Sequence, residues 1–320
     1  MKPARIEASL SYAMIPYLRS LVNAALISGS VLLFSVHILA PLFTPIVGPP
    51  DFSTTKSLSL PAAAKLRLVQ TDGRIRVYTH SDPAVSSIAI EASLKVYLNP
   101  GADASGIRDF ANSLVASKGD SSELAIQTEP AERPESVNTV LVDYVIHVPA
   151  GTDIDLTGSN GNVWIAQGCG DVSVRGNNTD IEIVNPGGIV LANTVNGRIR
   201  LVEGRDDAVL DTENGNIYAH MLNGTLDART TNGFIVARIL DPAVKAFDLY
   251  SDNGGITVVA GDDASFSFKA KTNRGLIRSS FPVDGKTGIL EGKELEGIVG
   301  DGRVQLNLTT LNGNIWLART

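Results

Sequence analysis

The stretch Val190–Ala237, VLANTVNGRIRLVEGRDDAVLDTENGNIYAHMLNGTLDARTTNGFIVA, decides the fold because it repeats itself. An Asn-Gly pair recurs in it every 18 residues, at Asn196, Asn214 and Asn232. The same step reaches back to Asn178 and Asn160. A fixed period of this kind is typical of a solenoid, in which each repeat forms one coil stacked on the last.

Apolar residues keep fixed places around each asparagine. They stand six and four residues before it and three and five residues after it, as Val190, Ala192, Ile199 and Leu201 do around Asn196. Alternation with a period of two predicts strands with one buried face. Each unit therefore holds two short strands joined by an Asn-Gly corner, where both residue types tolerate positive φ.

Stacked corners would bring the asparagine side chains together, so we expect them to form a hydrogen-bonded ladder of amides. The template also fits around Asp72-Gly73 and, with a slip of one residue, near Asn273. The predicted ladder consists of Asn160, Asn178, Asn196, Asn214, Asn232, Asn253 and Asn312.

The predicted fold is an all-β, single-stranded parallel β-helix, or β-solenoid, with coils of about 18 residues. Regular coils are expected over 151–320, and an elaborated first section of the same solenoid over 58–150. In that section Ile107, Phe110, Ala111 and Leu114 have helical spacing and predict one short amphipathic helix, capped by Asp103 or Ser105. Residues 119–136 are polar and predict a loop.

The first 50 residues predict a membrane anchor. The apolar run 21–43 carries no charged residue and is long enough to cross about 30 Å of hydrocarbon as a helix. It has no convincing Ala-x-Ala cleavage site, which favours an uncleaved signal anchor. Lys2, Arg5 and Arg19 against Glu7 place segment 1–20 in the cytoplasm, so 58–320 would be extracytoplasmic, behind a tether at 44–57.

Composition excludes several classes of function. The chain has 320 residues and a formal net charge of −7, which argues against a nucleic-acid binder. A single cysteine, Cys169, excludes an intramolecular disulfide, a CxxC redox pair and a cysteine-rich zinc site. We find no pattern for catalytic residues, a bound cofactor or a metal ion. The calcium-roll nonapeptide is absent, so the turn aspartates are expected to be solvated.

The stretch Val142–Ile165 (VDYVIHVPAGTDIDLTGSNGNVWI), the serial NGxI turns and the terminal LNLTTLNGNIWLA (Leu306–Ala318) resemble the bacterial putative-adhesin, β-strand-repeat family of unknown function and its head-GIN relatives. The resemblance covers about Ser57 to Thr320. It implies a solenoid in a single-span or secreted envelope protein. The family has no agreed catalytic residues, so it assigns none here, and a fold does not supply a function.

One outward row offers a candidate binding face. The fourth residue after each asparagine is Trp164, Glu182, Arg200, Tyr218 or Val236. Trp164, Arg200 and Tyr218 could together hold a glycan or a protein partner, although mixed pairs on an exposed strand face are common. Trp316 has the same offset in the last coil, where we expect it to cap the stack.

The sequence thus favours a non-enzymatic, membrane-anchored, extracytoplasmic module of the cell envelope that interacts with a protein or glycan partner. An alternative is self-assembly into a filament through open coil edges near Leu317. A carbohydrate-active enzyme is less favoured, because its candidate side chains, Arg175, Asp211 and Arg229, lie in a row of mixed charge.

Overall fold

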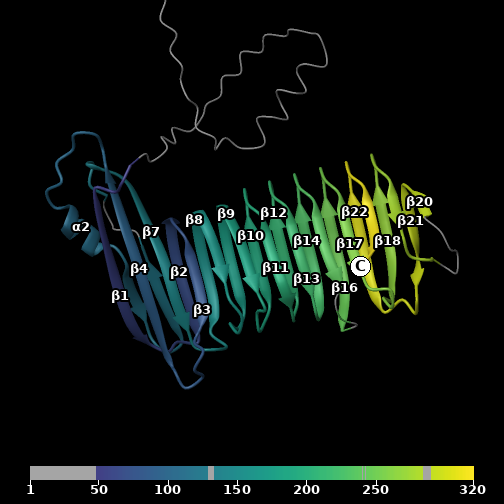
Figure 1. The fold of residues 1–320 in the computed structure, drawn as a ribbon, viewed down its shortest axis with the longest axis horizontal. Helices are drawn as coiled ribbons and strands as arrows, with labels where there is room; N and C mark the ends of the chain where they lie inside the picture. The colour runs from purple at the N-terminus through teal and green to yellow at the C-terminus, as the bar shows by residue number, and fades with distance from the viewer. Residues whose placement is uncertain (1–47, 129–132, 240, 242, 284–289) are drawn as a thin grey trace, which may run out of the picture. The chain divides into compact units, whose positions relative to one another are not determined.

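The computed structural model describes residues 48–128, 133–239, 241, 243–283 and 290–320 (Figure 1). Pro49–Thr320 forms one compact unit. It is all-β: its 23 described strands belong to one hydrogen-bonded sheet, and α2 (Ile107–Ser113) is the one α-helix of the described part.

The predicted cytoplasmic segment 1–20 and the predicted span 21–43 lie outside the described residues. Within the described ranges, no helix has the length and apolar character needed to cross a membrane.

The repeats build two parallel ladders, here named ladder A and ladder B. Strands before each Asn-Gly corner pair in ladder A, so that Ala192 lies between Val174 and Leu210. Strands after the corner pair in ladder B, where Leu201 lies between Ile183 and Ala219. Neighbouring partners are 18 residues apart, the period read from the sequence. The central strands are β8 (Asp153–Ile165), β9 (Val172–Val184), β10 (Val190–Thr194), β11 (Ile199–Gly204), β12 (Ala208–Thr212), β13 (Ile217–Met221), β14 (Gly224–Thr230), β15 (Ile235–Ile239), β16 (Val244–Ser251) and β17 (Ile256–Ala260).

Strands β8 and β9 run round the corner and take part in both ladders. Alternate side chains of each short strand are buried, as in the buried–exposed alternation of β10 and β12. The inward side chains form one apolar core cluster that continues through the unit. A strand that buries every second residue gains most of its stability from that burial, which explains why the period-two pattern located the strands.

The corners are held by side chains that stack on themselves. The amide of each ladder asparagine donates to Oδ1 of the asparagine one coil away, over 2.6–3.0 Å from Asn160 to Asn312. Asp72 continues the row by accepting from Asn160 at 2.7 Å. Two residues before the corner stands a buried hydroxyl, such as Thr212, which donates to the carbonyl of Gly197 at 3.0 Å.

The structure corrects the reason for glycine at most of these corners. Gly161 has φ 133°, but Gly197, Gly215 and Gly233 are not among the residues with positive φ. A Cβ at Gly215 would instead lie 1.8 Å from the carbonyl oxygen of Gly197, and one at Gly233 would lie 1.9 Å from that of Gly215. Glycine is required there because the corners of successive coils touch.

The N-terminal section turns from parallel to antiparallel pairing. Ladder A continues from β8 through β2 and β6 to an antiparallel edge strand, β5. Ladder B continues through β3 and β7 to two antiparallel strands, β4 and β1. The strands of this section are β1 (Phe52–Pro61), β2 (Lys65–Asp72), β3 (Ile75–Thr79), β4 (Ser87–Leu98), β5 (Ala116–Gly119), β6 (Glu123–Gln127) and β7 (Val137–Val148).

Three predictions for this section are wrong. The tether predicted at 44–57 overlaps β1, whose alternate residues pack against the core beside β4. The loop predicted at 119–136 contains β6, which pairs with β2 and β5. Helix α2 is preceded by Gly106 with φ 77° and has no side-chain cap, because Asp103 accepts from the backbone and hydroxyl of Ser105 instead.

The last coil is inserted into the stack and does not end it. Strand β22 pairs in parallel with both β16 and β18, and β23 pairs with both β17 and β19. The C-terminus consequently lies among the strands in Figure 1. Antiparallel β20 and β21 lie outermost. These strands are β18 (Phe266–Thr272), β19 (Ile277–Ser279), β20 (Leu290–Gly292), β21 (Glu294–Val299), β22 (Val304–Thr310) and β23 (Ile315–Arg319).

This order overturns the predicted cap at Trp316. Its strand is flanked by Thr257 and Arg278, and Leu317 beside it is fully buried. No open coil edge exists near Leu317, so an association through edges would have to use other strands.

Candidate functional site

The predicted binding row lies on the outer face of ladder B. Trp164 is level with Glu182, which is level with Arg200, and Arg200 is level with Tyr218. Successive residues of the row are one strand apart, about 4.8 Å. The parallel register therefore brings all three predicted residues into one line, with Glu182 among them.

Packing divides this line into separate groups. The guanidinium of Arg200 pairs with Glu182 at 2.7 Å. Tyr218 packs edge-on against Phe234, with ring centroids 5.4 Å apart. Trp164 instead contacts residues of the N-terminal section, so the line is not one continuous binding surface.

Trp164 begins a row of four rings that the sequence did not predict. Its ring centroid lies 4.9 Å from that of Tyr78, and Tyr78 stacks on His147 at 5.2 Å. His147 in turn lies 5.9 Å from His80. The row crosses from β8 over β3 to β7, so it stands where the repeats meet the N-terminal section.

A shallow hollow of about 370 Å³ lies at the Trp164 end of this row. Side chains from four strands and one corner surround it, including Arg74, Arg76, Tyr78, Asn162, Trp164, Asp180, Glu182 and Arg198. Arg74 pairs with Asp143 at 3.1 Å and Arg198 with Asp180 at 3.5 Å. Arg76 is exposed, lies level with Trp164 and forms no ion pair with another described residue.

Asp143 fixes one wall of the hollow. Burial opposes ionisation of this carboxyl, but hydrogen bonds from Arg74 and Lys95 outweigh that effect and lower its pKa to about 2. The carboxylate accepts from Arg74 at 3.1 Å and from Lys95 at 3.0 Å. It therefore ties β3, β4 and β7 together and holds the Arg74 guanidinium in place.

Of the predicted residues only Trp164 lines the hollow; Arg200 and Tyr218 do not. Sequence reasoning missed Arg76, Tyr78 and His147. Arg76 and Tyr78 could have been found, because they stand four and six residues after Asp72 in the template already aligned there. His147 could not, because β7 follows a segment without the period.

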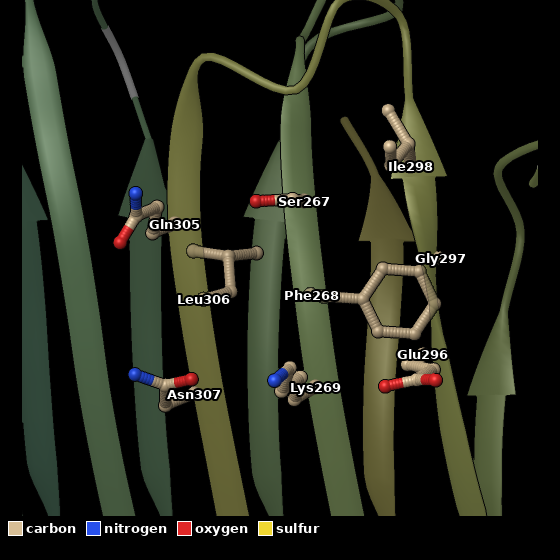
Figure 2. A pocket seen from close by; sticks show the side chains of 9 residues that line it. All are labelled: Ser267, Phe268, Lys269, Glu296, Gly297, Ile298, Gln305, Leu306 and Asn307. Carbon is tan, nitrogen blue, oxygen red and sulfur yellow. The ribbon is translucent and has the colours of Figure 1, made fainter.

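A larger hollow of about 460 Å³ lies on the outer face of ladder A near the C-terminal end of the stack (Figure 2). Its outward side chains are Ser267, Lys269, Glu296, Ile298, Gln305 and Asn307. Phe268 is only 3% exposed and lies opposite Gly297, so it offers little ring surface to a ligand. Because Lys269 lies opposite Glu296, the hollow also lacks an excess of one charge. We therefore regard the hollow on ladder B as the stronger candidate.

The other candidates from the sequence lie apart from this hollow. Cys169 is buried, and burial raises the pKa of its thiol to about 12, far from the thiolate that a nucleophile needs. Turn aspartates such as Asp171 accept backbone N–H groups of the next coil. Across the described ranges, no three His, Cys, Asp or Glu side chains are grouped to hold a metal ion.

The residues considered for polysaccharide cleavage do not meet in a catalytic arrangement. Asn193 separates Arg175 from Asp211 in the register of ladder A. Arg175 pairs with Asp155 at 3.2 Å, and Arg229 with Asp227 at 3.0 Å.

Solved structures similar to this chain come from gut Bacteroidetes and a Clostridium. No protein-family model matches the chain, and no curated protein matches its sequence. A putative adhesin from Bacteroides fragilis aligns with 14% identity and a TM-score of 0.48, covering 84% of this chain and 98% of that one. A putative lipid binding protein from Parabacteroides distasonis aligns with 10% identity and a TM-score of 0.41, covering 84% and 99%.

A putative adhesin from Parabacteroides distasonis aligns with 8% identity and a TM-score of 0.40, again covering 84% of this chain and 99% of that one. The structural neighbours are thus mainly putative adhesins, the same kind of protein as the family that the sequence resembles.

Proposed function

We propose that this protein is an adhesin-like interaction module of the cell envelope, built as a β-solenoid and held at the membrane by a single span at 21–43. Its binding face is the outer face of ladder B around Trp164. The observation that carries the proposal is the ring row, in which Trp164, Tyr78 and His147 remain partly exposed beside an unpaired Arg76.

Two features support binding at this face. Exposed aromatic rings offer apolar area and a polar edge, a combination enriched at recognition surfaces. The strands beneath are paired on both sides, so the side chains stand on a rigid surface before the ligand arrives. We propose a binding role in place of a catalytic one because the charged residues near the hollow, Arg76 apart, mostly neutralise one another in ion pairs.

The test is crosslinking and pull-down of the full-length protein from its native cells. Trp164→Ala should abolish recovery of the partner, because it removes the ring that begins the row. Trp316→Ala is the matched control: Trp316 is 54% exposed on the same outer row, six strands or roughly 29 Å away.

Loss with Trp164→Ala and retention with Trp316→Ala, at equal expression and Tm, would support the proposal. Equal recovery from both variants would contradict it. Recovery of only further copies of the chain, unaffected by Trp164→Ala, would favour self-assembly as the function.

A further inference from the structure

We propose that the hollow binds an acidic polysaccharide, a polymer of uronate sugars, lying along ladder B. This inference rests on the proposed function and names the ligand class of the same face. Three observations carry it: the ring row, the unpaired guanidinium beside it, and a second hollow that extends the same track.

The ring row fits the flat face of a sugar. A pyranose presents axial C–H bonds on one face, and these bear a small positive charge. Aromatic faces are negative and attract such groups. Trp164 and Tyr78, with ring centroids 4.9 Å apart and planes inclined at 55°, form a shallow angled platform on which sugar rings can rest.

The unpaired Arg76 supplies the charge preference. Residues 51–320 carry a net charge of −9, given −7 for the whole chain and +2 for residues 1–50, so a cationic spot is locally unusual. Arg74 and Arg198 at the same hollow already have carboxylate partners. Arg76 has none among the described residues and can form a bidentate pair with a carboxylate of the ligand.

The track is longer than one sugar. A second hollow of about 390 Å³ lies beyond the rings, over β1, β4 and β7, and is lined by Ser57, Ser59, Glu91 and His147. His147 stacks on Tyr78, which lines the first hollow, so the rings join the two hollows. Hydroxyl groups and an imidazole along this extension suit a hydroxyl-rich polymer.

A sugar polymer fits this face better than an acidic peptide does. Extended peptides commonly add to an unpaired sheet edge, where their backbone gains hydrogen bonds. Here β3, β7 and β8 are paired on both sides, so they offer side chains only. Binding would then depend on rings and charge, which sugars with carboxylates match.

The experiment measures binding of the full-length protein, in detergent micelles, to immobilised polygalacturonate and alginate. Fully methyl-esterified polygalacturonate keeps the sugar chain but removes its charge, and poly-L-glutamate keeps the charge but removes the sugar. The variants are Arg76→Gln, Trp164→Ala and the control Arg67→Gln, which changes an exposed arginine of β2 on ladder A.

We expect Arg76→Gln to weaken binding of at least one of the acidic polysaccharides by about tenfold or more, the value of a charge-assisted hydrogen bond, whereas Arg67→Gln leaves it unchanged. The methyl ester should bind about as weakly to the native chain as the acid binds to Arg76→Gln. Trp164→Ala should weaken binding of both the acid and the ester.

Three results would overturn the inference: equal binding of acid and ester, no binding of either acidic polysaccharide, or poly-L-glutamate binding as tightly with the same dependence on Arg76. Each leaves the proposed function standing if Trp164→Ala still abolishes partner recovery from cells. If Trp164→Ala leaves that recovery unchanged, the proposed function itself fails.

Discussion

The central coils and the N-terminal section hold together in different ways. In the central coils, identical residues repeat every 18 positions, and like contacts like: asparagine on asparagine, glycine on glycine, threonine on a glycine carbonyl. In the N-terminal section the strands become antiparallel and single charged residues replace the repeating contacts. Asp143 ties three strands, and Lys56 is directed at the end of α2.

The difference teaches where a repeat can carry function. A stack of identical coils presents the same corners and rows throughout, whereas its end must stop the stacking and bring in unrelated residues. The candidate site lies at the junction. Trp164 comes from the first regular coil, and Tyr78 and His147 come from strands that precede it.

The largest expected effect breaks the central stack. Gly215→Ala should lower the free energy of unfolding by about 3–5 kcal/mol, because its Cβ would lie 1.8 Å from the carbonyl oxygen of Gly197. Gly158→Ala is the control, since a Cβ there meets nothing within 4 Å. Thermal unfolding followed by circular dichroism measures both. Equal melting temperatures for the two variants would show that the corners do not touch.

An intermediate effect tests the N-terminal end. Lys56 Nζ donates to the carbonyls of Val115 at 2.9 Å and Leu114 at 3.2 Å, where α2 ends. Lys56→Met keeps most of the apolar stem but removes these bonds, and should cost about 1–3 kcal/mol. Hydrogen exchange should quicken in 107–119 while the central coils stay protected. Lys118→Met, on the exposed strand β5, should leave exchange unchanged; faster exchange throughout the unit would contradict separate holding of the two regions.

The smallest effect is a dependence on pH. The pKa of Asp143 is lowered to about 2 in the fold, against about 3.9 in an unfolded chain, so its contribution is present above pH 4 and is lost as the pH falls toward 2. Asp143→Asn should therefore be less stable than the native chain at pH 7, by about 1 kcal/mol because water screens the partly exposed pair.

Urea unfolding at several pH values checks this prediction. The difference between Asp143→Asn and the native chain should shrink as the pH falls from 4 to 2. A difference that is constant over this range would show that Asp143 does not hold the section through its charge.

The sequence predicted the central strands because both of their determinants are local. The period locates each corner, and the apolar alternation around Asn196 or Asn214 locates the buried face. The buried hydroxyl two residues before the corner, as in Thr212 and Thr230, also recurs at this period and was available as a signal.

Coil order and end structure could not be predicted in the same way. A repeat specifies the shape of a coil but not its neighbour, so nothing local indicated that Asn312 contacts Asn253, with the coil of Asn273 lying farther out. The same limit hid the site, because the pairing of Tyr78 with His147 joins strands separated by an irregular segment.

The most direct test of the binding face is photo-crosslinking in native cells. The photoreactive residue p-benzoylphenylalanine replaces Trp164 in one variant and Trp316 in another, so an aromatic ring stays at each position. Light should link the partner to the chain at position 164 and leave position 316 unlinked. Linkage at 316 but not at 164, or equal linkage at both, would contradict a binding face at the junction of the two regions.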